Sequence, residues 1–254
     1  MQLTLAHLYP RLMNIYGDYG NIQALKYRCQ KRKIKLNIFN VYPNTPLVSG
    51  SFDLLFAGGG QDQQQLIIAK DLLKHKQVIH QSAKQGIPML TICGSYQLFG
   101  QYFQPFKGPK LPGISIFNAY TIASKKRKIG NIIIKLNTKY QILNTKYLIG
   151  FENHSGNTFL QENTQPLGKV QIGFGNNGQD KTEGAVFNNV FGCYLHGSLL
   201  PKNPYFADHL IKLALKPKYG NVKLAPLNDS LELTTHQQVI NRTKKLSHPL
   251  LKYV

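Results

Sequence analysis

Short apolar segments alternate with segments of helical periodicity in the first half of the chain. Apolar residues spaced three and four positions apart predict helices over residues 22–29 and 63–81. Strands that alternate with crossover helices are typical of a mostly parallel sheet with helices on both faces, so the pattern predicts an α/β fold. The predicted strands are residues 3–8, 33–41, 52–57 and 87–92.

The second half of the chain has a different pattern, in which Gly, Asn and Pro separate short β segments. These segments predict an antiparallel extension at one edge of the sheet. Another apolar strand leads to His196, and helices are expected over residues 203–216 and 230–246. We expect one domain over residues 1–215 and a helical extension over residues 216–254 that packs on it. The predicted β segments are residues 113–121, 130–136, 147–152, 170–174 and 184–187.

Composition narrows the class of protein. The chain has 254 residues, 42% of them hydrophobic, and no apolar run approaches the roughly 18 residues that span a bilayer. The first residues lack both a basic region and a small-residue cleavage site, so we expect no export. Cys29, Cys93 and Cys193 form no CxxC pair, which disfavours a disulfide framework and a zinc-ribbon site. We expect a cytoplasmic protein with reduced thiols and no bound metal.

The net charge of +20 arises from 31 Lys and Arg against 11 Asp and Glu. A surface of this charge attracts polyanions in general. The basic residues are nevertheless dispersed, and no signature of a nucleic-acid-binding fold is present. Two interpretations stay open, namely a lysine-rich composition without a function of its own and an acidic partner or anionic substrate.

Cys93 ends an apolar segment and is followed by the small residues Gly94 and Ser95 and then by a helical pattern. This order is typical of a nucleophile at a sharp strand–turn–helix corner. The N-terminus of such a helix favours the ionised form of a thiol placed there. A buried cysteine at the end of an ordinary core strand is the alternative interpretation.

Two predicted helices begin after turn-forming segments. Residues 16–21 form a turn in which Asp18 or Asn21 is expected to cap the first helix. Residues 58–60 are three successive glycines after a predicted strand, and they allow backbone N–H groups to approach a ligand closely. A flexible connection between strand and helix is the alternative for these glycines.

His196 directly follows an apolar strand, as Cys93 does. The carboxyl ends of parallel strands meet at one edge of a sheet, so the two side chains are expected within hydrogen-bond reach. A thiol beside an imidazole is the arrangement of a cysteine nucleophile. Cys193 and Cys29 are expected in the core.

Several segments together resemble class I glutamine amidotransferases, over residues 1–215. Residues 91–97 are similar to the cysteine corner of that family. Residues 58–60, 150–156 and 194–197 are similar, in that order, to the oxyanion loop, the Gly-aromatic-Glu-x-His segment and the histidine segment of its cobyric acid synthase branch. Within this branch, the chain looks most like the glutaminase subunits of lipid II isoglutaminyl synthases. The segments that carry this closer resemblance are residues 16–22, 150–154, 181–184 and 195–203.

The resemblance implies a covalent mechanism on glutamine. It makes Cys93 the expected nucleophile and His196 the group that takes and returns a proton. The backbone N–H groups of Gly94 and of Gly59 or Gly60 are expected to bind the oxyanion.

Arg127 lies where this family places an arginine for the substrate, and a guanidinium suits the α-carboxylate of glutamine. The alternative is one more charge in a solvated basic loop. Glu152 and Gln97 are candidate supporting residues.

The chain departs from the family at two positions. Ser95 replaces a glycine of the corner, so the turn is expected to be strained or slightly different in shape. Ser198 stands where enzymes with a catalytic triad carry glutamate. Either a Cys–His dyad suffices, or Glu152 or a partner subunit supplies the carboxylate. Our hypothesis is that the partner supplies it, which would make the isolated chain a poor glutaminase.

The resemblance also implies a heterodimer with a Mur ligase-like subunit that holds ATP and Mg²⁺, with no cofactor in this chain. The complex would amidate the D-glutamate of lipid II to D-isoglutamine at the cytoplasmic face of the membrane. The absence of a phosphate-binding motif from the sequence agrees with this division. Alternatives are another carboxylate acceptor such as a cobyrinic acid, hydrolysis of a different amide, and a non-catalytic basic α/β binding module.

Overall fold

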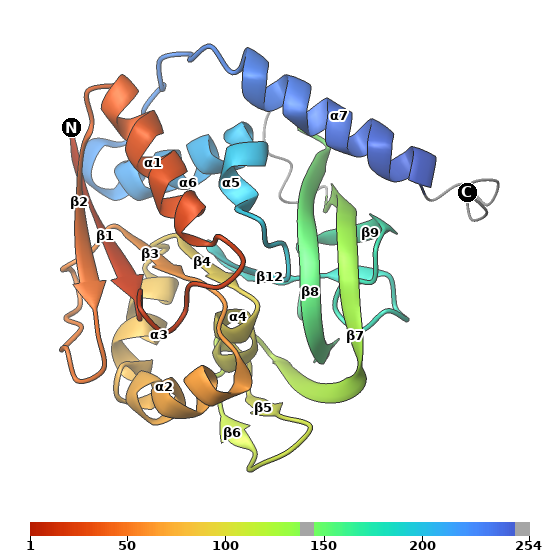
Figure 1. Cartoon of the computed structure of the whole chain (residues 1–254). Coiled ribbons are helices and arrows are strands. Elements are labelled where there is room, and N and C mark those ends of the chain that lie inside the picture. The colour runs from red at the N-terminus through yellow and green to blue at the C-terminus, as the bar shows by residue number, and fades with distance from the viewer. Residues whose placement is uncertain (138–144, 247–254) are drawn as a thin grey trace.

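A six-stranded sheet, parallel except at one edge, positions both predicted catalytic side chains (Figure 1). The computed structural model describes residues 1–137 and 145–246. The strands run in the order β11-β12-β4-β3-β1-β2, and only β11 is antiparallel to its neighbour. They are β1 (Gln2–Leu8), β2 (Lys35–Val41), β3 (Leu54–Ala57), β4 (Met89–Ile92), β11 (Ala185–Phe187) and β12 (Val190–Cys193).

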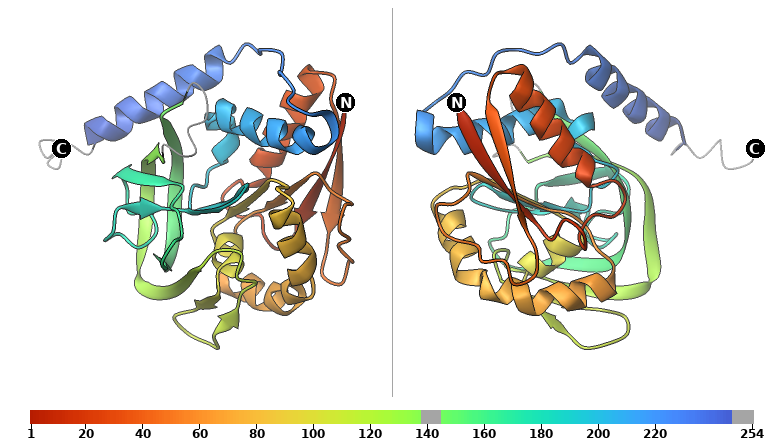
Figure 2. Two further views of the ribbon diagram at one scale, coloured as in Figure 1. Left: turned by 180° about the vertical axis from the view of Figure 1, so that it is seen from behind. Right: turned by 60° about the vertical axis from the view of Figure 1, so that its left-hand side comes forward.

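Helices cover both faces of this sheet, as the sequence predicts (Figure 1 and Figure 2). Helices α1, α5 and α6 lie on one face, and α2, α3 and α4 lie on the other. The expected α/β fold with a mostly parallel sheet is therefore confirmed. The helices are α1 (Tyr19–Lys31), α2 (Asp62–Lys74), α3 (Lys76–Lys84), α4 (Gly94–Phe99), α5 (Leu199–Lys202) and α6 (Pro204–Tyr219).

The single long helix predicted over residues 63–81 is wrong, because the segment forms α2 and α3 with a break at His75. The His75 N–H donates to the carbonyl of Leu72, three residues back, which tightens and ends α2. The carboxylate of Asp71 holds this end of α2 by accepting hydrogen bonds from the Tyr9 hydroxyl and the Asn44 N–H. Apolar periodicity continues through the break and therefore did not reveal it.

Most of the second half forms a separate sheet, which corrects the expected extension of the first one. Only β11 adds an antiparallel strand to the first sheet. The second sheet is built on the long antiparallel pair of β7 and β8 and joins the first through backbone bonds between Phe151 and His196. Its strands are β5 (Tyr102–Gln104), β6 (Leu111–Pro112), β7 (Ala119–Leu136), β8 (Tyr147–Leu160), β9 (Gly168–Ile172) and β10 (Thr182–Glu183).

The predicted strand over residues 113–121 is wrong for its first part, since β7 begins only at Ala119. Residues 113–118 instead wrap around the end of α4. The N–H groups of Ile114 and Ile116 donate to the carbonyls of Leu98 and Phe99 at 2.9 and 2.8 Å. These carbonyls have no partner within a helix that ends there, so the wrapped segment satisfies them.

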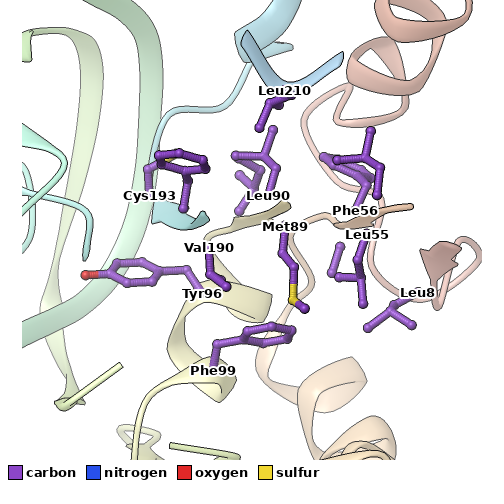
Figure 3. Close-up of a cluster of buried hydrophobic side chains, with 14 of the residues drawn as sticks. Leu8, Leu55, Phe56, Met89, Leu90, Tyr96, Phe99, Val190, Cys193 and Leu210 are labelled. Carbon is purple, nitrogen blue, oxygen red and sulfur yellow. The ribbon is translucent and has the colours of Figure 1, made fainter. Parts of the chain in front are cut away.

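Apolar side chains fill the space between the first sheet and its helices (Figure 3). Every residue of β3, β4 and β12 is buried, as expected for central strands covered on both faces. Figure 3 shows Leu210 of α6 on one side of these strands and Phe99 of α4 on the other. Cys29 and Cys193 are both buried in this core, and burial raises the pKa of each thiol, so neither favours the reactive thiolate.

A buried cluster of two arginines and two aspartates attaches the C-terminal part of the chain to α1. Arg28 binds Asp208 of α6 and Asp229, which precedes α7 (Ser230–Leu246), at 2.6 Å each. Arg32 also binds Asp208, at 2.7 Å. Both arginine side chains are 3% exposed, so the cluster is screened from water. It fixes the start of α7 to α1 and α6.

Helix α7 crosses the ends of β7 and β8 (Figure 1). Its Ile240 packs against Ile133 and Ile149 of these strands. The predicted boundary at residues 215 and 216 falls inside α6, and residues 247–254 of the predicted extension lie outside the described residues. Within residues 1–137 and 145–246, none of the helices combines the length and apolarity needed to cross a bilayer.

The arginine–aspartate cluster yields a test of stability. Arg28→Ala leaves the partly buried Asp208 and Asp229 with one partner fewer or none, and breaking a buried ion pair costs up to about 3–5 kcal/mol. We expect urea unfolding to show a loss of this size. Arg242→Ala, which removes an exposed arginine of α7, is the control and should change the free energy of unfolding by less than about 0.5 kcal/mol. Equal effects of the two variants would contradict a structural role for the cluster.

Candidate active site

Cys93 occupies the strand–turn–helix corner that the sequence predicts, between β4 and α4. Its backbone has φ of +52° and ψ of −106°, a conformation that residues with a side chain rarely adopt. The corner is held by a hydrogen bond from the Cys93 N–H to the Cys193 carbonyl, 2.8 Å long. Strain of this kind is stored where the surrounding structure enforces it, and here it directs the thiol into a pocket.

Ser95, which replaces a glycine of the family pattern, links the cysteine corner to the glycine loop at residues 58–60. Its hydroxyl donates to the Gly58 carbonyl at 2.6 Å and is buried. A side chain at Gly94 would place its Cβ 3.0 Å from the Gly60 carbonyl oxygen, so a larger residue there would require the glycine loop to shift. The serine therefore supports the corner by a hydrogen bond.

His196 lies three residues after the end of β12 and is paired with a carboxylate from the other end of the chain. Its Nδ1 is 3.0 Å from Oδ1 of Asp18, and both side chains are fully buried. Its Nε2 has no hydrogen-bond partner among the described residues. Burial alone would lower the pKa of His196, but the charges of the Cys93 thiolate and Asp18 outweigh burial and raise it to about 10. The site therefore favours the protonated, positively charged form of His196.

Asp18 is the functional residue that the sequence did not identify. It stands at the start of α1, as expected, but its carboxylate makes no capping hydrogen bond. Its Oδ1 faces His196, and its Oδ2 accepts the N–H of Gly59 at 2.7 Å. The other expected cap, Asn21, instead accepts the N–H of Leu200. Two features of the sequence could have pointed to Asp18. It is one of only 11 acids in the chain, and it lies in a turn that follows β1, at the same edge of the sheet as Cys93.

The structure places Asp18, and neither Glu152 nor Ser198, in hydrogen-bond contact with the His196 ring. Glu152 accepts the N–H groups of Phe174 and Gly175, at 2.7 and 2.9 Å, so it holds that loop. Ser198, at the position of the family's glutamate, donates to the Gly17 carbonyl. This bond ties the histidine segment to the loop that carries Asp18. Asp18 of this chain therefore occupies the place beside His196 that the hypothesis gave to a carboxylate of the partner.

The contacts of the glycine loop change the prediction that the Gly59 N–H could bind the oxyanion. The Gly59 N–H is engaged by Asp18, so it is not available to an oxyanion in this structure. A Cβ at Gly59 would lie 2.6 Å from Cε1 of His196, which explains why a glycine stands there. Gly60 lines the pocket, and Gly94 begins α4 with an N–H that has no partner within the helix. These two glycines remain the predicted donors.

A pocket of about 390 Å³ opens on Cys93. Residues from both sheets line it, because the loops after β1, β3 and β4 form one wall and the β7–β8 pair forms the other. The lining residues are Ile15, Tyr16, Gly60, Gln61, Asp62, Gln63, Gln65, Cys93, Gln97, Arg127, Asn153, His154 and Ser155.

Arg127 belongs to the wall of this pocket. Residues 124–127 form an irregularity in the pairing of β7 with β8, and such bulges redirect side chains near active sites. The Arg127 guanidinium donates to Oδ1 of Asn153 through Nε and Nη2, at 3.1 and 2.5 Å, and to the Tyr16 hydroxyl at 3.3 Å. Tyr16 in turn meets His196 edge to face, with 5.0 Å between the ring centroids. These contacts hold Arg127 at the pocket.

Gln97 and His154 complete the inner wall. The Gln97 Nε2 donates to the Tyr194 hydroxyl at 3.1 Å, and its Oε1 is buried without a hydrogen-bond partner among the described residues. His154 stacks on Tyr194 at 3.6 Å between centroids, and burial lowers its pKa, so its ring is neutral. Gln97 lines the same pocket as Cys93, and its supporting role stays a prediction.

Comparisons with known proteins agree with this geometry. The CobB/CobQ-like glutamine amidotransferase domain matches residues 4–204. The chain is 41% identical over 232 residues to the lipid II isoglutaminyl synthase (glutamine-hydrolyzing) subunit GatD of Streptococcus pneumoniae, which covers 91% of this chain and 87% of the relative. It is 36% identical over 244 residues to the subunit of the same name from Staphylococcus aureus, which covers 96% and 97%.

Among solved structures, PurLQS from Thermotoga maritima is similar with a TM-score of 0.60. The match covers 85% of this chain and 99% of that chain at 14% sequence identity, so it shows the fold alone.

Asp18→Asn tests the carboxylate at His196. The amide keeps the shape but removes the charge that holds the imidazolium, so glutamine hydrolysis should fall roughly 10²- to 10⁴-fold in kcat. Steady-state release of glutamate measures this. The matched control is Glu162→Gln, which neutralises an exposed acid and should leave kcat unchanged. An active Asp18→Asn enzyme would show that the Cys–His pair works without the carboxylate.

The pKa of His196 predicts the alkaline limb of the pH–rate profile. His196 holds its proton below a pKa of about 10, and a departing amine needs that proton. Activity should therefore persist through the ordinary histidine range and decline as the pH rises through about 10. In Asp18→Asn the limb should move to lower pH, since one of the two negative charges is gone. A wild-type limb near the ordinary histidine value of about 6.5 would contradict the assigned charges.

Proposed function

The chain belongs to the CobB/CobQ-like glutamine amidotransferase family, and we propose that it is the glutaminase subunit of a synthetase that amidates lipid II. Family membership makes it a glutamine-hydrolysing enzyme and excludes a non-catalytic binding module. The observation that carries the proposal is that the His196–Asp18 pair lies next to Cys93, and that Cys93 lines a pocket.

The reaction begins with attack of the Cys93 thiolate on the side-chain amide carbon of glutamine. The amide oxygen becomes an oxyanion that accepts N–H groups of Gly60 and Gly94, and one such donor is worth about 2.7–4 kcal/mol of the barrier. When the C–N bond breaks, the His196 imidazolium gives its proton to the leaving nitrogen, and ammonia departs. The products of this step are ammonia and a γ-glutamyl thioester on Cys93.

Water then cleaves the thioester. His196, now neutral, takes a proton from the attacking water, and glutamate leaves as the Cys93 thiolate forms again. Asp18 keeps Nδ1 protonated and the ring oriented throughout, which leaves Nε2 for each proton transfer. This scheme revises the hypothesis from sequence, because every group that it uses belongs to this chain.

The proposed partner is inferred from the names of the relatives, which are subunits of a larger enzyme. Two relatives that align with this chain over most of their length are named as subunits of a glutamine-hydrolysing lipid II isoglutaminyl synthase. We propose that the partner here is a Mur ligase-like subunit that binds ATP and Mg²⁺ and activates the D-glutamate carboxylate of lipid II. Ammonia made at Cys93 would then form D-isoglutamine. Because lipid II is lipid-linked, the complex would work at the cytoplasmic membrane face.

The proposal is tested by supplying ammonia in two ways. The wild-type chain and Cys93→Ala are each purified with a co-expressed Mur ligase-like partner and given ATP, lipid II and either glutamine or an ammonium salt. With glutamine, only the wild type should produce amidated lipid II, detected by its mass. With ammonium, both complexes should do so, because the variant lacks only the ammonia source. Cys29→Ala, at a core cysteine, serves as the control and should behave as the wild type.

Two results would contradict the proposal. Amidation from glutamine by the Cys93→Ala complex would remove Cys93 from the reaction. Glutamine hydrolysis without amidation of lipid II, in a complex that uses ammonium on a different carboxylate, would assign another acceptor. We also expect the wild-type chain to hydrolyse glutamine without its partner, since its catalytic groups are complete.

A further inference from the structure

Asp62 contributes an unpaired negative charge to the catalytic pocket. It is the first residue of α2, directly after the glycine loop and Gln61, and it lines the pocket that opens on Cys93. Its side chain is exposed and makes no hydrogen bond or ion pair with any described residue. The proposed mechanism gives this carboxylate no role.

Among the described residues, Asp62 shares its lack of a side-chain partner with Glu162 and Glu232, but of these three acids it alone lines the pocket. The chain has 11 acids against 31 Lys and Arg, so carboxylates readily find cations. Most of the acids that the structure describes are engaged by a cation, a hydroxyl or a backbone N–H. These are Asp18, Asp53, Asp71, Glu152, Asp180, Glu183, Asp208 and Asp229.

Arg127 and Asp62 place opposite charges in one pocket. The pocket wall removes part of the water around the Asp62 carboxylate, although the residue still reaches solvent, and this partial desolvation raises its pKa. The positive charge of Arg127 acts in the opposite direction, so the two groups interact electrostatically. They nevertheless form no ion pair, because Arg127 is held by Asn153 and Tyr16. Among the residues that line the pocket, Asp62 is the one carboxylate. Two opposite charges kept apart beside a nucleophile fit a zwitterion whose reactive end points at Cys93.

We propose that Asp62 binds the α-ammonium group of glutamine while Arg127 binds its α-carboxylate, so that the pair selects a free α-amino acid as ammonia donor. This inference rests on the proposed glutaminase reaction at Cys93. An ammonium group donates charge-assisted hydrogen bonds to a carboxylate, which are stronger than neutral ones.

Selection of a zwitterion has a consequence for the proposed reaction. A carboxamide within a peptide has an acylated, uncharged nitrogen and offers Asp62 no cation. Such an amide leaves the carboxylate of Asp62 unpaired in the bound state, which disfavours binding. The enzyme would therefore hydrolyse glutamine but spare amidated peptides, including its own proposed product.

The test compares two substrates that differ only in the ammonium group. L-Glutamine carries it, and 4-carbamoylbutanoate has the same carboxamide and carboxylate without it. Using the full chain in complex with its partner, we expect Asp62→Asn to lower kcat/KM for glutamine about tenfold, mainly through KM, which corresponds to about 1.4 kcal/mol. The value for 4-carbamoylbutanoate should change less than twofold. Asp62→Glu should recover part of the loss.

Glu232→Gln is the matched control, because it removes an acid from the first turn of α7, outside the pocket. It should leave both substrates unaffected. Equal losses on both substrates in Asp62→Asn would overturn the inference and assign Asp62 to the stability of α2 or the glycine loop. No change on either substrate would overturn it as well.

A binding measurement separates this inference from the proposed function. Calorimetric titration of L-glutamine into Cys93→Ala and into Cys93→Ala with Asp62→Asn needs no turnover. Weaker binding by the double variant would support the role of Asp62 even if the wild type released no glutamate, a result that would count against the function. Equal binding by both would reject the role of Asp62.

Discussion

The site depends on the hydrogen bonds that the buried carboxylate of Asp18 makes with the His196 ring and the Gly59 N–H. A carboxylate removed from water is stable only when charges and hydrogen bonds replace its hydration. Asp18 obtains them from the His196 ring and the Gly59 N–H, which belong to the segments after β12 and β3. One side chain therefore fixes the histidine and the glycine loop relative to each other. Neighbouring bonds reinforce this arrangement, since Ser198 binds the Gly17 carbonyl and Asn21 binds the Leu200 N–H.

The second sheet turns this catalytic edge into a substrate pocket. Backbone bonds between Phe151 and His196 place β8 against the end of β12. The irregular pairing of β7 then brings Arg127 to the pocket, where Asn153 and Tyr16 hold it. The first sheet positions Cys93 and His196, and the second sheet brings the Arg127 guanidinium to the pocket. In the proposed binding mode of glutamine, Asp62 supplies the complementary anion.

The sequence predicted what local patterns encode. The strands, the covering helices, the corner at Cys93 and the strand end at His196 follow from apolar periodicity and from small residues at a turn. The pairing of Asp18 with His196 joins residues 178 positions apart, and no local pattern marks it. A polar residue in a turn before a helix looks like a cap, and only the tertiary structure shows that its carboxylate faces inward. The bulge that directs Arg127 and the break at His75 depend equally on distant contacts.

The charge state of His196 tests the proposed catalytic centre most directly. The measurement is nitrogen-15 NMR of the histidine-labelled chain without its partner, recorded at about pH 8. This pH lies well above the ordinary histidine pKa of about 6.5, at which an unperturbed ring would be neutral. If Asp18 and the Cys93 thiolate hold the imidazolium, both ring nitrogens of His196 should be protonated at this pH, and Asp18→Asn should reduce that protonation. A neutral His196 ring in the wild-type chain would contradict a catalytic centre that is assembled within this chain.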